Sequence, residues 1–395
     1  LQDYYRRLDG SFTKRLKGMN LLLGSNLPPR RGLSSSSALV VSIALGMKEI
    51  NDIRIPLGEF IDRVGYSEWY RFTRGASADH AAIVLSRRGH ISHISSLPTK
   101  AEEVSYAPFP EDYRVIVVSS GFERPQDEDT RNYLRVTAAA YRLALLLIKN
   151  RYPEYAEKLE WLRDVTTRNL GVELATIYEI LKSLPEVIDR EELRNRLAER
   201  YHPELEIILA NHSEPRGGYK IRQMALFGLA EAERAVVFPE FLRRGDVKGM
   251  LELVRRSHDG DRVAKFDREG RQIPWDARIF SSDERLEELI AILRSRASTP
   301  SQIESAQLYW QPGGYERSIA PIDHVCDIVS HNLGDYAAAQ IIGAGLGGDV
   351  EVIIQKDKIE ELRRVLTEEY CKHYRIELAM TTIFPGQGAC LIRPP

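Results

Sequence analysis

The sequence contains few cysteines and no long hydrophobic run. Its three cysteines, Cys326, Cys371 and Cys390, form no CxxC pair, and no cysteine–histidine cluster has the spacing of zinc ligands. Their odd number fits a reducing compartment and argues against a disulfide scaffold. The longest apolar stretches, at 39–47 and 143–148, are far shorter than the roughly twenty residues of a membrane-spanning helix. Because the chain also opens on a polar segment and not on a signal peptide, we expect a soluble, cytoplasmic protein.

The sequence also lacks an excess of charge of either sign. It has 55 lysines and arginines against 57 aspartates and glutamates, which gives a formal net charge of −2. No global basic field is available to hold nucleic acid or an anionic membrane, so we expect neither as a partner. With 395 residues, of which 43% are hydrophobic and 28% charged, the chain has the composition of a globular protein and the length of two or three domains.

Motifs of several nucleotide-binding families are missing as well. No G-K-[S/T] occurs, which excludes a Walker A loop, and no H-R-D or D-F-G set occurs, which excludes the protein-kinase arrangement. Gly343–Gly348 (GAGLGG) formally satisfies G-x-G-x-x-G, but residues 349–354 predict a strand where a dinucleotide-binding fold needs a helix. We interpret this cluster as a strand–glycine turn–strand element that lets another backbone or a phosphate approach closely. A tight hairpin is the purely structural alternative.

Hydrophobic periodicity predicts a mixture of helices and strands, and hence an α/β or α+β protein of two domains. An apolar run at 18–24 predicts a strand, charged amphipathic helices fill 151–214, and the stretch 266–312 gives no clear pattern. The other predicted helices cover 34–49, 130–149, 223–244, 247–257, 322–333 and 359–370, and the other predicted strands cover 91–93, 114–120, 338–342, 350–355 and 390–392.

The segment from Pro28 to Leu39 (PPRRGLSSSSAL) carries the most chemistry. A glycine turn, a row of hydroxyls and an apolar helix follow one another, so free backbone N–H groups meet the positive end of a helix dipole. Such a point binds anions, and the serine hydroxyls add donors to phosphate oxygens or ligate a divalent cation. The structural alternative is a serine-rich helix cap that uses only one of the serines. In its full context the segment favours a nucleotide site.

Together these motifs resemble the GHMP kinase superfamily and, within it, the galactokinase branch. GLSSSSAL at 32–39 matches the family's second motif, and GAGLGG at 343–348 matches its third. The segment 74–80 (RGASADH) resembles the stretch with the galactokinase catalytic aspartate, and 119–136 resembles the stretch that ends in Y-N-x-R. Further matches lie at 231–234, 243–258 and 315–325. The family's first motif has no match, and we expect it in a segment upstream of Leu1.

The resemblance implies a fold and an activity. The fold is α+β, with an N-terminal GHMP kinase domain like domain 2 of ribosomal protein S5 over residues 1–190, truncated at its start, and a ferredoxin-like C-terminal domain over 191–395. The activity is ATP-dependent, Mg²⁺-dependent phosphorylation of the anomeric hydroxyl of galactose or a related sugar, by a monomer or weak homodimer. Two alternatives stay open: a catalytically silent homologue that binds ATP and sugar, and a GHMP kinase with another small-molecule acceptor.

The resemblance also assigns roles to individual residues. Asp79 would accept the proton of the sugar hydroxyl or orient it, although its position alone favours a cap on the following helix. His80, which stands where the family has glutamine, would be a sugar contact or a local cap, and Tyr133 would contact the sugar. Ser36 and Glu68 would ligate Mg²⁺. The expected nucleotide-binding residues are Gly32, Leu33, Ser34, Ser35, Ser36, Ser37, Gly343, Gly345, Gly347 and Gly348.

Overall fold

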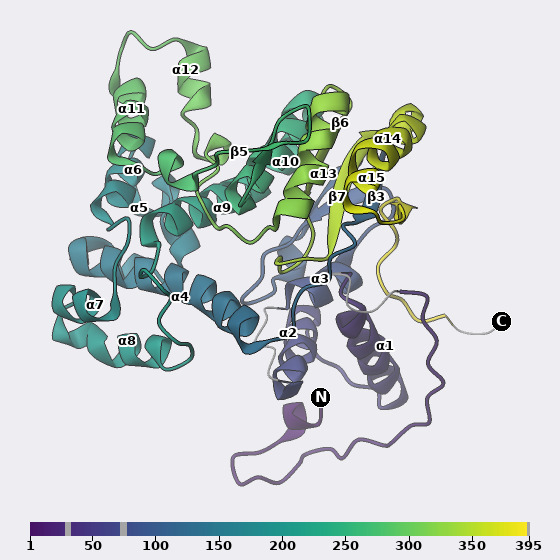
Figure 1. Ribbon diagram of the computed structural model, residues 1–395. Coiled ribbons are helices and arrows are strands. Elements are labelled where there is room, and N and C mark those ends of the chain that lie inside the picture. The colour runs from purple at the N-terminus through teal and green to yellow at the C-terminus, as the bar shows by residue number, and fades with distance from the viewer. Residues whose placement is uncertain (28–32, 72–76, 393–395) are drawn as a thin grey trace. The chain divides into compact units, whose positions relative to one another are not determined.

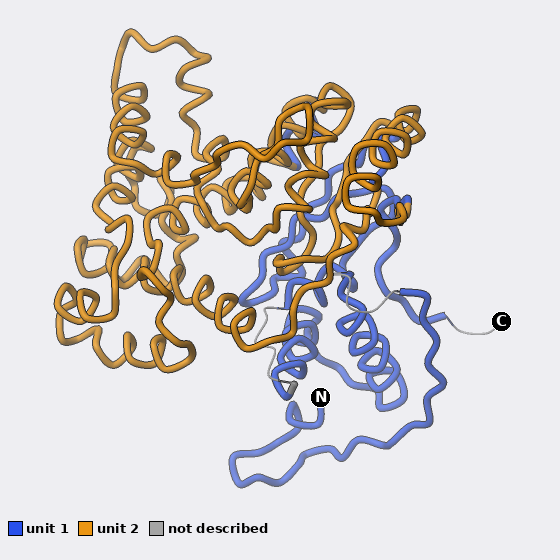
Figure 2. Tube along the Cα trace, in the orientation of Figure 1, with its two compact units in different colours: residues 1–115, 239–246, 382–395 blue, residues 116–238, 247–381 orange. Residues whose placement is uncertain are grey.

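The chain forms two compact units (Figure 2) in the computed structural model shown in Figure 1. The residues that it describes are 1–27, 33–71 and 77–392. Unit 1 comprises residues 1–115, 239–246 and 382–395, and unit 2 comprises residues 116–238 and 247–381. The expected domain boundary between residues 190 and 191 lies inside unit 2, because the helices on both sides of it share one hydrophobic core. The family domains over 1–190 and 191–395 therefore stay a prediction, distinct from the compact units.

Within its described residues, unit 1 contains three complete α-helices and a short antiparallel strand pair. Its elements are α1 (Ser35–Ile50), α2 (Leu57–Ser67), α3 (Ala78–Leu85), β1 (His90–His93) and β2 (Ser105–Pro108). The three helices bury a small apolar core, to which Val41, Phe60, Ile61, Val64 and Ala81 contribute. The helix predicted at 34–49 and the strand predicted at 91–93 are confirmed as α1 and β1.

Two predicted strands are wrong. Residues 18–24 form no strand, and Leu22 in their middle is fully exposed. An apolar run meets the local preference of a strand, but a strand also needs a neighbour that accepts its hydrogen bonds, and no described strand pairs with this run. Residues 390–392 form no strand either, because the chain before them bonds to the end of α3: Gly388 and Ala389 donate their N–H groups to the carbonyls of Ser86 and Ile83.

Unit 2 combines a helical part with most of a four-stranded sheet. The strand order of the sheet is β6-β7-β3-β8, and β6 runs antiparallel to β7 with Ala337 opposite Ile354. The strands are β3 (Tyr113–Ser119), β6 (Ala337–Ile341), β7 (Asp349–Gln355) and β8 (Met380–Ile383), while β4 (Lys265–Phe266) and β5 (Gln272–Ile273) form a separate pair. Helices α10 and α13 pack on β6, and the buried side of the sheet forms one core with α13 and α14.

The helical part of unit 2 has its own core, built mainly from α4, α6, α8, α9 and α11. The α-helices of the whole of unit 2, including those that pack on the sheet, are α4 (Glu128–Arg151), α5 (Thr167–Leu170), α6 (Leu174–Ser183), α7 (Arg190–Arg196), α8 (His202–Leu209), α9 (Ile221–Arg244, whose last residues belong to unit 1), α10 (Val247–Asp261), α11 (Asp283–Arg294), α12 (Pro300–Ser305), α13 (Ala320–Leu333), α14 (Ile359–Val365) and α15 (Lys372–Tyr374). None of the helices described above is long and hydrophobic enough to serve as a membrane span.

Most predicted elements of unit 2 are confirmed. The helices expected at 130–149, 223–244, 247–257 and 322–333 are α4, α9, α10 and α13, and the strands expected at 114–120, 338–342 and 350–355 are β3, β6 and β7. The helix expected at 359–370 begins as α14 and continues through a π-helical turn, η10 (Leu366–Cys371). Helix α11 lies in the stretch that gave no pattern, and Ser282 caps it by accepting the N–H of Arg285. The mixed α+β class is confirmed.

Candidate functional site

The serine row lies at the start of α1 in unit 1. Ser34 precedes the helix in a left-handed conformation, with φ 50° and ψ 38°, and its side chain makes no capping bond. Leu33 and Ser35 are half-buried and Ser36 is exposed, whereas Gly32 lies outside the described residues. The first N–H groups of a helix have no acceptor within the helix. The start of α1 therefore offers such groups beside serine hydroxyls, as an anion site requires.

Three of the predicted site residues come together next to α1. The buried Ser37 hydroxyl donates to Oε2 of Glu68 over 3.3 Å. Nε2 of His80 lies 3.5 Å from the same oxygen, and His80 is only 2% exposed. Among the described residues, neither ring nitrogen of His80 has a hydrogen-bond partner. These side chains come from α1, from the short 3-10 helix η2 (Glu68–Arg71) and from α3, so the tertiary fold brings them together.

The Ser37–Glu68 pair suits a hard cation. Mg²⁺ prefers oxygen ligands and is usually held by one or two carboxylates together with substrate phosphates. Ser36 and Glu68 were the expected pair, but it is Ser37 that contacts Glu68, and Ser36 is exposed. Both serines cannot face Glu68, because successive residues of a helix point about 100° apart. Across the described ranges, no group of three or more His, Cys, Asp and Glu side chains is arranged to hold a metal ion. A hydroxyl and a carboxylate thus fit Mg²⁺ here if phosphate oxygens complete the ligand set.

Asp79 lies in the first turn of α3 with an exposed side chain. The helix begins at Ala78 and its N-cap is Ser77, so Asp79 is not the cap that its position alone favoured. Among the residues that the structure describes, Asp79 makes no hydrogen bond or ion pair. A carboxylate in a first turn interacts favourably with the helix dipole. Asp79 is therefore an ionisable group that remains open to a ligand, one residue before the buried His80.

The glycine cluster of unit 2 connects β6 to β7. Gly343, Gly345, Gly347 and Gly348 have φ values of 75°, 83°, 131° and 102°, in the region that favours glycine. The expected strand–glycine turn–strand element is confirmed by β6 and β7 on its two sides.

Backbone segments of unit 2 fill the space beside these glycines. A Cβ on Gly345 would meet the carbonyl oxygen of Arg317, and a Cβ on Gly347 would come within 2.7 Å of the backbone nitrogen of Arg124. The N–H of Leu346 donates to the Arg317 carbonyl over 2.7 Å. The sequence predicted that either another backbone segment or a phosphate approaches these glycines, and the structure shows a backbone segment there. Phosphate binding by this turn stays a prediction.

Tyr133 lies on α4 and donates its hydroxyl to the carbonyl oxygen of Glu316 over 2.7 Å. Burial raises the pKa of the Tyr133 phenol, and the nearby Glu316 carboxylate raises it further. The hydroxyl therefore stays protonated at neutral pH. Its role as a sugar contact stays a prediction.

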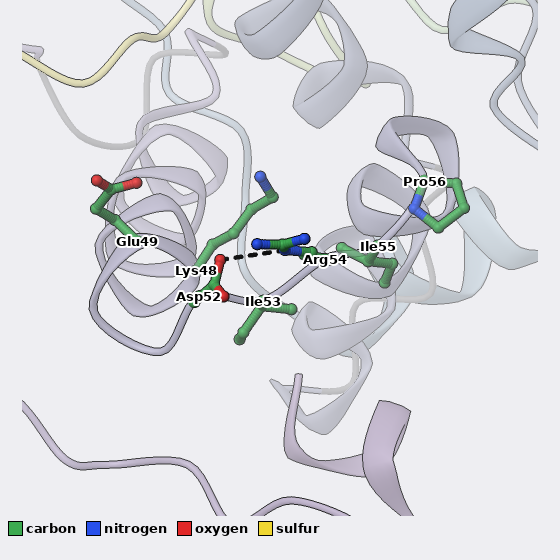
Figure 3. A pocket seen from close by; sticks show the side chains of 7 residues that line it. All are labelled: Lys48, Glu49, Asp52, Ile53, Arg54, Ile55 and Pro56. Carbon is green, nitrogen blue, oxygen red and sulfur yellow. Dashed lines mark hydrogen bonds and ion pairs between the residues drawn. The ribbon is translucent and has the colours of Figure 1, made fainter.

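A pocket of unit 1 lies at the other end of α1 (Figure 3). It has a volume of about 560 Å³ and is lined by Lys48, Glu49, Asp52, Ile53, Arg54, Ile55 and Pro56. Asp52 and Arg54 form an exposed ion pair of 3.5 Å among these residues. At ~1.5 Å per residue, Lys48 lies about 16 Å along α1 from Ser37. This pocket is thus separate from the group of predicted site residues.

Sequence reasoning proposed Ser37, Glu68 and His80 singly and for different roles, and it missed that they touch. The sequence did contain one indication: both Ser37 and His80 are polar residues next to apolar helical sequence, where a polar side chain becomes buried. That signal shows which side chains need partners, but not which partner each one has.

Comparisons with known proteins agree on one family. The family model "GHMP kinases N terminal domain" matches residues 2–87. The galactokinase of Haemophilus influenzae (strain PittGG) is 20% identical over 376 residues, which cover 95% of this chain and 72% of that protein. The galactokinase of Actinobacillus pleuropneumoniae serotype 5b (strain L20) is 19% identical over 361 residues, which cover 91% and 68%.

A solved structure adds the same similarity at the level of the fold. The crystal structure of Lactococcus lactis galactokinase complexed with galactose superposes with a TM-score of 0.51 at 13% identity, and the match covers 92% of this chain and 68% of that one. At this identity the likeness shows the fold.

Proposed function

Because this chain is a galactokinase-like member of the GHMP kinase superfamily with the α+β fold of that family, we propose that it transfers the γ-phosphate of ATP to the anomeric hydroxyl of galactose or a related sugar. Phosphoryl transfer to an alcohol group follows from the family. The acceptor and the residue roles are the proposal. The observation that carries them is the meeting of Ser37, Glu68 and His80 beside the open Asp79 carboxylate.

The start of α1 would hold the phosphate end of ATP. Ser34 to Ser37 supply hydroxyls and first-turn N–H groups, and the resemblance adds Gly32 and Leu33 to this cradle. Ser37 and Glu68 would ligate Mg²⁺, and Ser36, exposed at the helix start, would turn to the phosphates or the cation. When bound, Mg²⁺ neutralises charge on the phosphates and on the transferred group.

Asp79 would receive the proton of the attacking sugar hydroxyl or orient that hydroxyl. In phosphoryl transfer the protein catalyses mainly by positioning the reactants and stabilising charge. A correctly positioned general base raises the rate by a further factor of about 10² to 10⁴. His80 is too buried to present its ring to a sugar without rearrangement, and its place beside Glu68 favours a supporting role there. Tyr133 as a sugar contact and a cytoplasmic monomer or weak homodimer belong to the same proposal. The glycine turn is left out of the proposed nucleotide site, because backbone segments of the protein itself lie beside Gly345 and Gly347.

A panel of sugars tests the function. The full chain is mixed with MgATP and, in turn, galactose, arabinose, a uronic acid and an N-acetylhexosamine, and ADP release is measured together with the sugar phosphate formed. We expect one sugar to give equal amounts of ADP and sugar 1-phosphate. MgATP binding without ADP release from any sugar would instead favour the silent homologue, and Asp79→Asn is the matched control for background ATP hydrolysis.

A further inference from the structure

A carboxylate that the proposed chemistry does not use is buried in α2. Asp62 is 6% exposed and is hydrogen-bonded to Ser77, the residue before α3. A buried carboxylate is strongly unfavourable unless hydrogen bonds replace its lost water. The groups that donate hydrogen bonds to Asp62 therefore identify the segments of the chain that this carboxylate connects.

Three donors bond to the Asp62 carboxylate. The backbone N–H of Thr99 donates to Oδ2 over 2.9 Å, and the Thr99 hydroxyl donates to Oδ1 over 2.6 Å. The Ser77 hydroxyl also donates to Oδ1 and lies 3.1 Å from the Thr99 hydroxyl. Ser77 and Thr99 are 0% and 5% exposed, so water does not compete for these bonds. Hydrogen bonds to a charged acceptor are among the stronger ones in proteins.

Ser77 is the residue from which α3 starts. Its carbonyl accepts the first helical bond, from the N–H of Ala81 over 2.8 Å. A serine in this position usually turns its hydroxyl to a first-turn N–H group. Here the hydroxyl makes no capping bond and is committed to Asp62. The start of α3 is thereby tied to α2, two residues before Asp79.

The face of α2 that carries Asp62 also carries two glycines, which allow the neighbouring chain to approach closely. Gly58, Asp62 and Gly65 follow the i, i+4, i+7 spacing of one helix face. A Cβ on Gly65 would come within 2.8 Å of the Ser77 Cβ, and a Cβ on Gly58 would clash with the carbonyl oxygen of Thr99. Gly65 and Asp62 thus make room for and bind Ser77 at the start of α3, and Gly58 makes room for the backbone of Thr99. Helices α2 and α3 lie side by side in Figure 1.

We propose that Asp62 is a positioning residue of the kinase: through Ser77 it fixes the first turn of α3 and so the place of the Asp79 carboxylate. The inference rests on the proposed function, in which Asp79 acts on the sugar hydroxyl. Because Asp62 is buried and bonded to Ser77 and Thr99, it would act through Ser77 and not by touching a substrate. Misplacing a reacting group by about 1 Å costs up to roughly 100-fold in rate. Loosening this tie therefore lowers kcat more than it lowers the affinity for MgATP.

Ser77→Ala is the mildest test, with Asp62→Asn as the second variant. Both are assayed with MgATP and the sugar of highest turnover in the panel. We expect kcat to fall roughly 10-fold to 100-fold while the Kd of MgATP stays within about twofold. Ser86→Ala, the same change at the far end of α3, is the matched control and keeps its kcat. Amide hydrogen exchange of residues 78–81 is measured in parallel without substrates, and we expect it to accelerate in Ser77→Ala and Asp62→Asn but not in Ser86→Ala.

The outcomes separate the inference from the function. If Asp79→Asn is inactive while Ser77→Ala keeps the kcat of the wild type, the positioning role is wrong and the tie serves stability alone. If Asp79→Asn turns over normally, the proposed function fails at its catalytic residue. Should Asp62→Asn not fold, Ser77→Ala decides by itself, because it removes one hydroxyl and introduces no new group.

Discussion

The serine row of unit 1 and the glycine cluster of unit 2 both look like nucleotide loops in sequence, and the fold treats them in opposite ways. In the serine row, polar groups remain open: Ser36 is exposed, and Asp79 nearby in the same unit has no described partner. In the glycine cluster, the backbone of Arg317 occupies the space beside Gly345 and takes up the N–H of Leu346. The comparison teaches that a loop indicates a binding site when its hydrogen-bonding groups are left unsatisfied, and a packing device when the protein itself satisfies them.

Removing the Asp79 charge should have the largest effect. Asp79→Asn keeps the shape of the side chain but cannot accept a proton, so we expect turnover to fall about 10² to 10⁴-fold. The exposed carboxylate makes no bond within the described residues, so the Tm and the MgATP affinity should change little. ADP release, thermal unfolding and nucleotide titration check these three statements. A variant with normal turnover would remove the chemistry from unit 1.

Filling the glycine turn should act on stability. Gly347→Ala places a methyl group about where the backbone of Arg124 lies, at a φ of 131° that alanine rarely adopts. We expect unfolding to become easier by roughly 2–4 kcal/mol, measured as a lower urea midpoint, with the MgATP affinity of the folded protein unchanged.

Gly217→Ala is the matched control for this change. Gly217 also has a positive φ, of 84°, but no atom lies within 4 Å of the added Cβ, so only backbone strain of about 1–2 kcal/mol is expected. If Gly347→Ala kept its stability and lost MgATP affinity, the glycine turn would be a phosphate site after all.

Removing the Ser37 hydroxyl should act on the cation. Ser37→Ala deletes the donor to Glu68, and a hydrogen bond to a charged group contributes about 1.5–3 kcal/mol, so Mg²⁺-dependent nucleotide affinity should fall roughly 10-fold or more. Nucleotide affinity without Mg²⁺ should stay the same. Ser42→Ala serves as control, since the exposed Ser42 hydroxyl bonds only to Ala38 of its own helix. An equal loss with and without Mg²⁺ would contradict a cation role for this pair.

Unit 2 should also be sensitive to acid. Burial, with the charges of His373 and His331, lowers the pKa of His324 from 6.5 to about 4. Between these values the unfolded chain binds a proton that the folded chain does not, so stability is complete above pH 6.5 and declines as the pH falls towards 4. From pH 7 to pH 5 this group alone accounts for about 2 kcal/mol.

His324→Phe tests this assignment. The substitution preserves the stacking on Phe266, where the ring centroids lie 4.3 Å apart, and removes the titrating group. The urea midpoint of the variant should depend less on pH between 7 and 5 than that of the wild type. An unchanged slope in His324→Phe would assign the acid sensitivity to other groups.

The sequence was informative where local pattern decides structure. Long amphipathic stretches such as α4 and β-branched runs such as β7 carry their periodicity in the chain itself, and their predicted limits match within two residues. The apolar run at 18–24 failed as a strand because pairing depends on a distant neighbour. Helix α11 escaped notice because half of its twelve residues are charged, although the other half are apolar and Leu286 and Leu289 are buried.

The candidate site shows the same limit. The motif resemblance pointed to Ser37, Glu68, Asp79 and His80 individually, since each residue type suits its chemistry. It could not show that the Ser37 hydroxyl, and not that of Ser36, reaches Glu68, because this depends on how α1 is rotated against η2. Asp62 gave no signal at all, because an acidic residue on an amphipathic helix normally faces solvent.

The most direct test of the contrast between the two loops is amide hydrogen exchange of the full chain with and without MgADP. We expect MgADP to slow exchange in residues 33–37 and at Glu68, while residues 343–348 exchange as they do without nucleotide. Slower exchange in 343–348 with no change in 33–37 would contradict it and assign the nucleotide to unit 2.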